Sequence, residues 1–425
     1  MTSLLRHHDF RQLWIAETAS HVGTQVVGVA LPVVAVAVLA ATPLEMGVLT
    51  ALETAAFLLI ALPAGAWVDR WRRQRVLVRA DTVRALALAT IPVAYLLDAL
   101  TLGQLYVVAA VVGTATVFFD VAYQSYLPTI VDRGQLTDGN GKLEISRAVA
   151  QVAGPGLTGV LLRVLAAPVL LVVTALGYLL SALFVSRIRH VDVVPDRSTR
   201  RRLREEIAEG LGFVVRHRLL RRIVACTGTA NLFGAITGTL LALYVLRTLG
   251  LSESTLGLVL SAGAAGGLAG AFTAAPLGRL IGDGRAIPLS AVAFGAFAAL
   301  TPLAVLVDGP ARIVALVAGG IGASWAVVVY NVLQVSFRQR LCPPHLLGRM
   351  NASVRFIVFG TMPLGGLLGG VLGTAIGVVP ALWVAVAGQL LAAVPVVISP
   401  LVGMRDLPLE LDETARPEVS PATPG

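Results

Sequence analysis

The sequence predicts an all-α membrane protein with twelve transmembrane helices in two six-helix pseudo-repeat bundles. Of its 425 residues, 56% are hydrophobic and only 13% are charged, and the mean hydropathy is +0.82. A soluble domain carries nearer a quarter charged residues. Twelve segments are apolar and long enough to span a bilayer, which takes about 20 residues per helix. One long polar stretch separates the sixth segment from the seventh.

The apolar segments follow one another with short connections on one side. They cover residues 12–40, 44–68, 76–97, 103–127, 143–165, 167–187, 220–247, 253–278, 286–307, 310–336, 350–375 and 378–402. The long break, 188–219, carries an arginine-rich run followed by apolar residues, which predicts an amphipathic helix on the membrane surface. We therefore expect a bundle at 1–187, a cytoplasmic linker at 188–219, a second bundle at 220–402 and a disordered tail at 403–425.

The net charge of +9 raises the question of nucleic-acid binding. Most of the 33 Lys and Arg residues lie in one alternate set of connections, whereas Arg163, Arg247 and Arg312 fall in the other set. This asymmetry follows the positive-inside rule and argues against a phosphate-binding face. We expect both termini and the linker to be cytoplasmic, with the chain as a monomer in the plasma membrane and no nucleic-acid partner.

The sequence gives no sign of an enzyme. Cys226 and Cys342 are too few for a disulfide framework or a metal site. No phosphate-binding loop and no Gly-x-Ser-x-Gly elbow is present. We expect no cofactor and no metal, with a small organic molecule and protons as partners and an ion gradient as the energy source.

The loop between the second and third segments carries a distinctive polar pattern. Its residues are Gly65, Asp69, Arg70, Arg72, Arg73 and Arg75. The order Gly-x-x-x-Asp-Arg followed by a basic cluster resembles the signature loop of the major facilitator superfamily, with Trp67 in place of the usual Leu and Arg72 in place of the second Gly. The resemblance implies a transporter with the major facilitator fold, in which Asp69 contacts the N-terminus of helix 11 near 348–351 when the cytoplasmic side is closed. A cluster that only fixes topology is the alternative.

Two further stretches, 119–128 and 144–155, resemble the drug/proton antiporter branch that includes macrolide efflux proteins and the enterobactin exporter. Gly154 and Pro155 stand where that branch has an antiporter motif in helix 5, which implies export by exchange; a kink that only fits neighbouring helices is the alternative. The halves also look like a diverged repeat. A shift of 208 residues places Arg147 on Arg355.

Polar side chains recur on helices 1, 4, 7 and 10, which line the central cavity in transporters of this resemblance. Lipid does not tolerate such stripes, so they face protein or a watery cavity. Interhelical hydrogen bonding that only holds the bundle is the alternative. The candidate cavity residues are Ser20, His21, Thr24, Gln25, Thr116, Gln124, Asn231, Asn331 and Gln334.

Five acids lie within predicted spans, where a charge costs roughly 2.5–3.5 kcal/mol at mid-bilayer. Asp81 with Arg84, and Glu144 with Arg147, are i,i+3 pairs that neutralise each other and serve structure or gating. The candidate proton-coupling acids are Glu53, Asp120 and Glu17. We favour Glu53, because it lies about 13 Å into helix 2, close to mid-bilayer. Asp120 is expected to be held ionised by Arg72, Arg73 or Arg84 as part of a gate.

The sequence therefore predicts a secondary transporter that drives efflux of amphiphilic drugs with protons, by alternating access. Two alternatives keep the fold: a dedicated exporter of a secondary metabolite or siderophore, and an uptake symporter. A third belongs to another class, a membrane sensor or scaffold that transports nothing. Titratable groups buried in the membrane favour transport, since a sensor does not need them.

Overall fold

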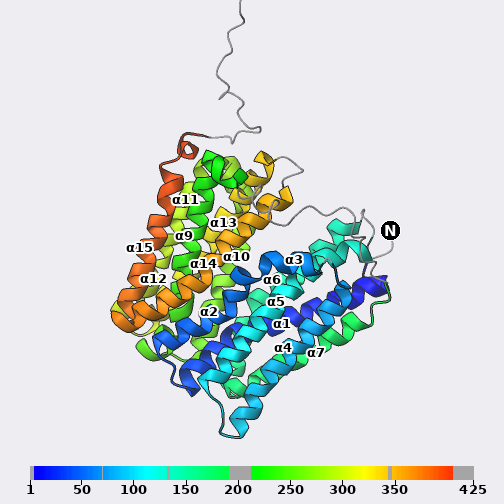
Figure 1. The fold of residues 1–425 in the computed structure, drawn as a ribbon. Coiled ribbons are helices and arrows are strands. Elements are labelled where there is room, and N and C mark those ends of the chain that lie inside the picture. Colours follow the sequence, from blue (N-terminus) through cyan, green and yellow to red (C-terminus); the bar gives the residue numbers. More distant parts are fainter. Residues whose placement is uncertain (1–3, 69, 132–134, 191–211, 343–346, 405–425) are drawn as a thin grey trace, which may run out of the picture.

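The computed structural model describes residues 4–68, 70–131, 135–190, 212–342 and 347–404. The regular elements of these residues are all helices, which run roughly parallel or antiparallel to one another (Figure 1). The predicted all-α class is therefore confirmed. The linker residues 191–211 and the tail residues 405–425 lie outside this description, and the predicted amphipathic helix and tail lie mostly within those ranges.

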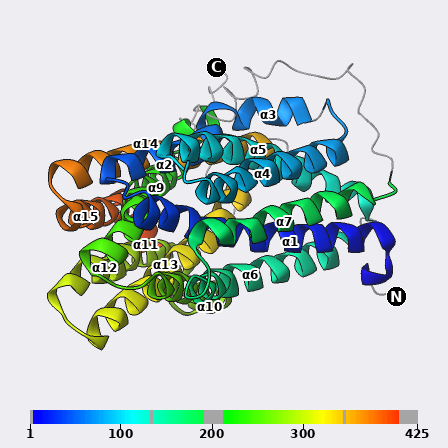
Figure 2. The same ribbon diagram turned by 90° about the horizontal axis from the view of Figure 1, so that it is seen from below.

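The helices fall into an N-terminal and a C-terminal set by position in the chain. The N-terminal helices are α1 (His8–Val33), α2 (Pro43–Leu59), α3 (Ala61–Val68), α4 (Arg73–Leu96), α5 (Leu102–Ile130), α6 (Leu136–Leu161) and α7 (Ala167–Ser186). The C-terminal helices are α9 (Arg218–Leu243), α10 (Glu253–Ile281), α11 (Asp283–Ala298), α12 (Leu300–Leu303), α13 (Pro310–Leu341), α14 (Leu347–Ala375) and α15 (Val378–Val397). Figure 2 shows α1 lying between α6 and α7, both of which it contacts.

Among the described residues, nine helices are long and apolar enough to cross a membrane. They are His8–Val38, Leu102–Ile130, Ala167–Ser186, Arg218–Thr248, Glu253–Ile281, Asp283–Leu306, Pro310–Gln339, Ser353–Ala375 and Val378–Val397. The other three predicted spans correspond to the broken pair α2 and α3, to α4 and to α6. Helix α4 carries Arg79, Asp81 and Arg84 in its length, and α6 carries Glu144 and Arg147. The count of twelve stays a prediction.

The predicted span 44–68 is interrupted at Ile60, where α2 ends and α3 follows. Pro63 explains the break, because it has no N–H to offer the carbonyl of Leu59 and its ring crowds that carbonyl. At the other end, Thr42 caps α2 in a capping box with Glu45, whose backbone N–H lies 3.4 Å from the Thr42 Oγ1. The start of this span is therefore fixed by local chemistry.

We name the two ends of the molecule by the chain segments found there. The turn face holds the short connections 39–42, 97–101, 162–166, 249–252 and 307–309. The terminal face holds the start of α1, the end of α5 and the start of α9. His217 caps α9 at this face, and partial burial lowers the pKa of its imidazole, which keeps the ring neutral and able to accept the Leu220 N–H.

Apolar packing differs between the two faces. At the turn face, one buried cluster joins Val34, Met46 and Leu105 of the N-terminal helices to Leu240 and Leu256 of the C-terminal helices. At the terminal face the two sets have separate clusters, one built around residues such as Phe10 and Tyr126 and another around residues such as Ile223 and Phe337. The two sets of helices accordingly diverge towards the terminal face (Figure 1).

Glycines bring the two sets of helices close together at two crossings. A Cβ placed on Gly257 of α10 would lie 2.5 Å from the carbonyl oxygen of Pro155 in α6. A Cβ on Gly47 of α2 would lie 2.8 Å from the carbonyl oxygen of Gly366 in α14. Only glycine fits such backbone contacts, as in other small-residue interfaces between membrane helices.

The turn face also has an arginine that links the two sets. Helices α1 and α9 each continue into a π-helical turn, Val34–Val38 and Tyr244–Thr248. Arg247 lies in the second turn and donates hydrogen bonds of 2.6 Å to the carbonyl oxygens of Val36 and Ala41. Val36 lies in the first turn, so one π-helical turn supplies the donor and the other an acceptor. These bonds join the two sets of helices at the turn face, where the shared apolar cluster also lies.

Candidate functional site

The buried charges of the N-terminal helices are organised around Arg84 of α4. Its guanidinium forms an ion pair with Asp81, and the two side chains are 2% and 0% exposed. Its Nη2 also donates to the Oγ of Ser20 in α1 at 3.4 Å. The rings of Phe119 (α5) and Tyr178 (α7) lie close by, with centroids 4.3 and 4.4 Å from the guanidinium carbon. Such cation–π contacts stabilise a desolvated cation, so four helices meet at this side chain.

Two more acids lie beside this ion pair. Glu17 of α1 is 4% exposed and its Oε1 lies 3.1 Å from the Nε2 of His21, one turn further along the helix. The other carboxyl oxygen of Glu17 is buried without a hydrogen-bond partner among the described residues. Asp120 of α5 interacts electrostatically with Arg84, Glu17 and His21. We call Glu17, His21, Asp81, Arg84 and Asp120 the acidic cluster, since it holds three acids and one arginine.

The acidic cluster carries more negative than positive charge when its acids are all ionised. With His21 neutral, three carboxylates face one guanidinium, and a protonated His21 still leaves one carboxylate in excess. Uncompensated charge is costly in a low-dielectric interior, where groups take up or release protons to become neutral. The arrangement is therefore suited to reversible protonation.

A side chain of the C-terminal helices reaches the same region. Arg355 of α14 donates a hydrogen bond of 3.3 Å to the Oε1 of Gln124, one turn from Asp120 on α5. Arg355 also interacts electrostatically with Asp120 and lies 5.8 Å from the ring centroid of Phe359. Phe359 in turn packs against Phe57 of α2, with ring centroids 5.7 Å apart. Sequence reasoning placed Asp120 near Arg72, Arg73 or Arg84; the structure gives it Arg84 and, unexpectedly, Arg355.

Glu53 of α2 is not paired with any member of the acidic cluster, although it interacts electrostatically with Tyr178, whose ring lies against Arg84. It is partly buried, and its side chain makes no hydrogen bond or ion pair with the described residues. The backbone of α5 packs closely here, because a Cβ on Gly113 would collide with the carbonyl oxygen of Glu53. The backbone of α2 at Glu53 is therefore packed tightly against α5, and the proton-coupling role of the Glu53 carboxyl group stays a prediction.

Of the remaining polar residues, those of α1 contact neighbouring helices, and those of α5 differ in exposure. The Oγ1 of Thr24 lies 3.0 Å from the hydroxyl of Tyr178. Gln25 packs against α6, where a Cβ on Gly154 would lie 2.5 Å from the Cβ of Gln25. Thr116 is partly buried and Gln124 is exposed. The predicted stripe of α1 is thus partly tied to neighbouring helices.

Helix α13 carries the polar stripe predicted for helix 10, and one residue more. The Nε2 of Gln334 donates to the Oδ1 of Asn331 at 3.3 Å. Arg338 continues this face one turn further; it is 7% exposed and its Nε has no hydrogen-bond partner among the described residues. Sequence reasoning missed Arg338, although its i+4 spacing from Gln334 was the signal. On α9, Asn231 is partly buried, and Thr227 pairs with the hydroxyl of Tyr330 at 2.9 Å.

The signature loop is only partly described. Asp69 lies outside the described residues, so its predicted gate contact remains a prediction. Gly65 belongs to α3, while Arg70, Arg72 and Arg75 are exposed. Arg73 is partly buried, and its Nε donates to the Oγ of Ser125 on α5 at 3.1 Å.

The predicted pair on α6 is present at the surface. Arg147 contacts Glu144 through two hydrogen bonds of 2.9 and 2.6 Å, and both side chains are more than half exposed. Further along α6, Gly154 packs on α1 and the carbonyl of Pro155 packs on Gly257 of α10. The Gly-Pro motif therefore lies where α6 meets both a neighbour in its own set and a helix of the other set.

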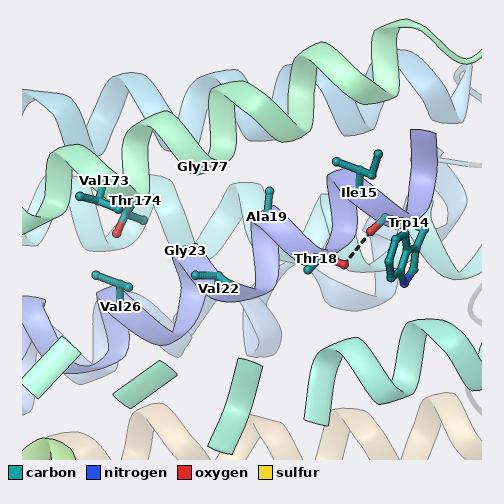
Figure 3. A pocket seen from close by; sticks show the side chains of 10 residues that line it. All are labelled: Trp14, Ile15, Thr18, Ala19, Val22, Gly23, Val26, Val173, Thr174 and Gly177. Carbon is teal, nitrogen blue, oxygen red and sulfur yellow. Dashed lines mark hydrogen bonds between the residues drawn. The ribbon is translucent and has the colours of Figure 1, made fainter. Parts of the chain in front are cut away.

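An apolar groove of about 380 Å³ lies between α1 and α7. Figure 3 shows Trp14, Val22 and Val26 of α1 along one side, with Val173 and Thr174 of α7 opposite. The dashed line marks the hydrogen bond of 2.7 Å from Thr18 to the Trp14 carbonyl. The groove holds none of the acidic cluster, so we do not assign it to the candidate site.

These helices, with buried acids in one set and arginines that reach over from the other, have the major facilitator fold of polytopic membrane proteins. The nucleoside transporter NupG (D323A mutant) has this fold, with a TM-score of 0.77 and 15% identity over 91% of this chain and 98% of its own. Over residues 2–420 the chain matches the transmembrane secretion effector family of this superfamily. The chain belongs to that family, and it is a transporter rather than an enzyme.

Two relatives show what similar chains do. The multidrug efflux pump Tap of Mycolicibacterium fortuitum is 28% identical over 344 residues, which is 79% of this chain and 82% of the relative. The enterobactin exporter EntS of Salmonella choleraesuis is 24% identical over 371 residues, 86% of this chain and 87% of the relative. The predicted superfamily and its efflux branch are thereby confirmed.

Proposed function

We propose that the protein exports amphiphilic organic molecules in exchange for protons, by alternating access between two six-helix bundles, residues 1–187 and 220–402. The observation that carries the proposal is the surplus of acids over arginines among the buried groups of the N-terminal helices. Membrane-embedded ionisable groups are costly and mark ion pathways. The names of the two relatives, a multidrug pump and a siderophore exporter, support export as the direction.

The orientation follows from the arginines. We place the terminal face in the cytoplasm of a cell whose plasma membrane holds the protein, because the basic connections gather at that face. Single cysteines at positions 200 and 310 test this in a background without Cys226 and Cys342. A membrane-impermeant thiol reagent on intact cells is expected to label position 310 alone; labelling at 200 alone would reverse the orientation.

Glu53 is our candidate for the transported proton. It has no hydrogen-bond or ion-pair partner among the described side chains and lies ten residues after the start of α2 at Pro43, about 15 Å along the helix. A carboxyl group at such a depth takes up and releases a proton in each transport cycle, whereas an acid that is permanently ion-paired stays ionised. A Glu53 that stays protonated and only bonds a neighbouring helix is the alternative.

The experiment is transport in liposomes with an imposed pH gradient, using a panel of dyes and macrolides. The wild-type protein is expected to accumulate several of them, and Glu53→Gln to abolish accumulation while binding survives and loses its pH dependence. Glu45→Gln, on the same helix but at the exposed capping box, serves as the control and should still pump. If Glu53→Gln pumps at the wild-type rate, Glu53 is structural and Asp120 or Glu17 takes its role.

A dedicated exporter of one secondary metabolite or siderophore is the second candidate, favoured by the likeness to an enterobactin exporter. The same panel separates the two, because a dedicated exporter would move one chemical class only. Absence of gradient-dependent flux over the whole panel and over siderophores would instead favour a sensor.

A further inference from the structure

Arg355 occupies a setting unlike that of its counterpart in the other half. A shift of 208 residues places Arg147 on Arg355. Arg147 is paired with Glu144 one turn earlier on its own helix, whereas the residue three positions before Arg355 is Ala352. Arg355 is exposed and, among the described residues, donates one side-chain hydrogen bond, to Gln124 of the other set of helices. Its charge is therefore not neutralised by an acid one turn earlier, as that of Arg147 is.

The acid with which Arg355 interacts is Asp120. Asp120 interacts electrostatically with Glu17 and His21 of α1, with Arg84 of α4 and with Arg355 of α14. Arg84 is already committed to Asp81, and Glu17 adds negative charge. Arg355 is thus a second arginine that interacts with Asp120 besides Arg84, and it comes from the opposite set of helices.

Both residues lie on the terminal side of the shared core. Asp120 stands ten residues before the end of α5 at Ile130, or about 15 Å along the helix. Arg355 stands eight residues after the start of α14 at Leu347, or about 12 Å along it. A rocking motion that brings the terminal ends of α5 and α14 together therefore shortens the distance between the two charges.

We propose that Arg355 couples protonation of the acidic cluster to closure of the terminal face. When the Asp120 carboxylate is ionised, it attracts Arg355 and favours the conformation in which the terminal ends approach. When a proton binds that carboxylate, the neutral acid loses the attraction, and the terminal ends separate. The inference rests on the proposed exchange of protons for substrate, and it assigns the link between proton and movement to one pair.

This sequence of events fits an exporter. Loss of a proton at the terminal face closes that face and opens the other, so substrate taken from the terminal side leaves on the turn side. Uptake of a proton from the turn side then weakens the attraction between Asp120 and Arg355. The carrier returns without substrate to the form that is open at the terminal face. A ligand or proton shifts such an equilibrium only through its different affinity for the two states, and the Arg355 contact supplies that difference.

The experiment measures the distance between spin labels across the terminal face. Labels at Asn140 of α6 and Gln339 of α13, both exposed, report its opening in a background with Cys226 and Cys342 replaced by serine. Between about pH 8 and about pH 5.5 the wild-type ratio of open to closed forms is expected to rise about fivefold or more, the lower range of typical couplings. Arg355→Gln and Asp120→Asn should both be mostly open, with a change below about twofold.

Two variants keep the test sharp. Arg355→Lys retains the positive charge and should retain a pH response, which separates charge from packing. Arg147→Gln removes the equivalent arginine of the other half and should respond as the wild type does. A full pH response in Arg355→Gln would overturn the inference. Because no substrate is needed, a pH response that depends on Arg355 stands even if liposome flux fails, and flux that survives Arg355→Gln unchanged rejects the coupling while leaving the exporter proposal in place.

Discussion

Two arginines of the N-terminal helices and two arginines of the C-terminal helices are used differently. Arg84 and Arg147 each pair with an acid on their own helix. Arg247 and Arg355 instead donate to the N-terminal set, one to backbone carbonyls at the turn face and one to Gln124. The N-terminal helices are thus an electrostatic unit with surplus acid, and the C-terminal helices supply cations that reach it. Relative movement of the two sets must change these contacts while leaving Arg84 undisturbed.

The largest loss of stability is expected when the buried ion pair between Arg84 and Asp81 is broken. Arg84→Met leaves Asp81 buried without its partner, and loss of one member of a buried ion pair costs about 3–5 kcal/mol. The thermal unfolding midpoint of the purified protein should fall accordingly. Arg147→Met, which breaks the exposed pair, should cost less than about 1 kcal/mol. Equal losses would mean that burial does not distinguish the two pairs.

A smaller effect is expected where a C-terminal arginine reaches across at the turn face. Arg247→Gln removes charge-assisted hydrogen bonds to two carbonyls, worth about 1.5–3 kcal/mol, and should favour opening of that face. A cysteine replacing Leu49, which is 3% exposed, should then react faster with a thiol reagent. Arg312→Gln is the control, because Arg312 donates to Val307 and Leu249 within its own set. Unchanged reactivity in Arg247→Gln would show that apolar packing alone closes the face.

The smallest effect is expected at an uncharged contact between the two sets of helices, the crossing of α6 and α10. Gly257→Ala places a methyl group 2.5 Å from the Pro155 carbonyl oxygen, and overpacking of this kind typically costs about 1–3 kcal/mol. Transport should slow and the unfolding midpoint should fall. Gly238→Ala, where nothing lies within 4 Å of the added Cβ, should change neither. A tolerated Gly257→Ala would mean that α6 and α10 separate at little cost.

Local features of the site were predictable from sequence, and long-range ones were not. Asp81 with Arg84 and Glu144 with Arg147 follow from i,i+3 spacing, because such residues are neighbours on any helix. The break between α2 and α3 had a signal in Pro63, which the apolar count of 44–68 hid. The contact of Arg355 with Gln124 joins residues 231 positions apart, and it depends on how α5 and α14 are placed by α2, which packs against both.

The cation–π contacts of Arg84 were unpredictable for the same reason. Phe119 and Tyr178 belong to two different helices and read in sequence as ordinary apolar positions of spans. The family and its fold were predictable because they depend on hydropathy and on a contiguous motif, which do not require knowledge of helix packing. Roles of individual acids depend on the surrounding helices, so sequence could only nominate them.

The two π-helical turns bear on the relation between the two halves of the chain. An i+5 hydrogen bond encloses one more residue than the ordinary i+4 bond, so a π-helical turn accommodates a one-residue insertion in a helix. Val34 and Tyr244, which begin the two turns, are 210 positions apart, close to the shift that aligns Arg147 with Arg355. If the two halves are the diverged repeat that the sequence predicts, the two π-helical turns occupy nearly equivalent positions in them. Under the shift of 210 residues the position that corresponds to Arg247 is Ala37, so only the second turn donates hydrogen bonds across the two sets of helices.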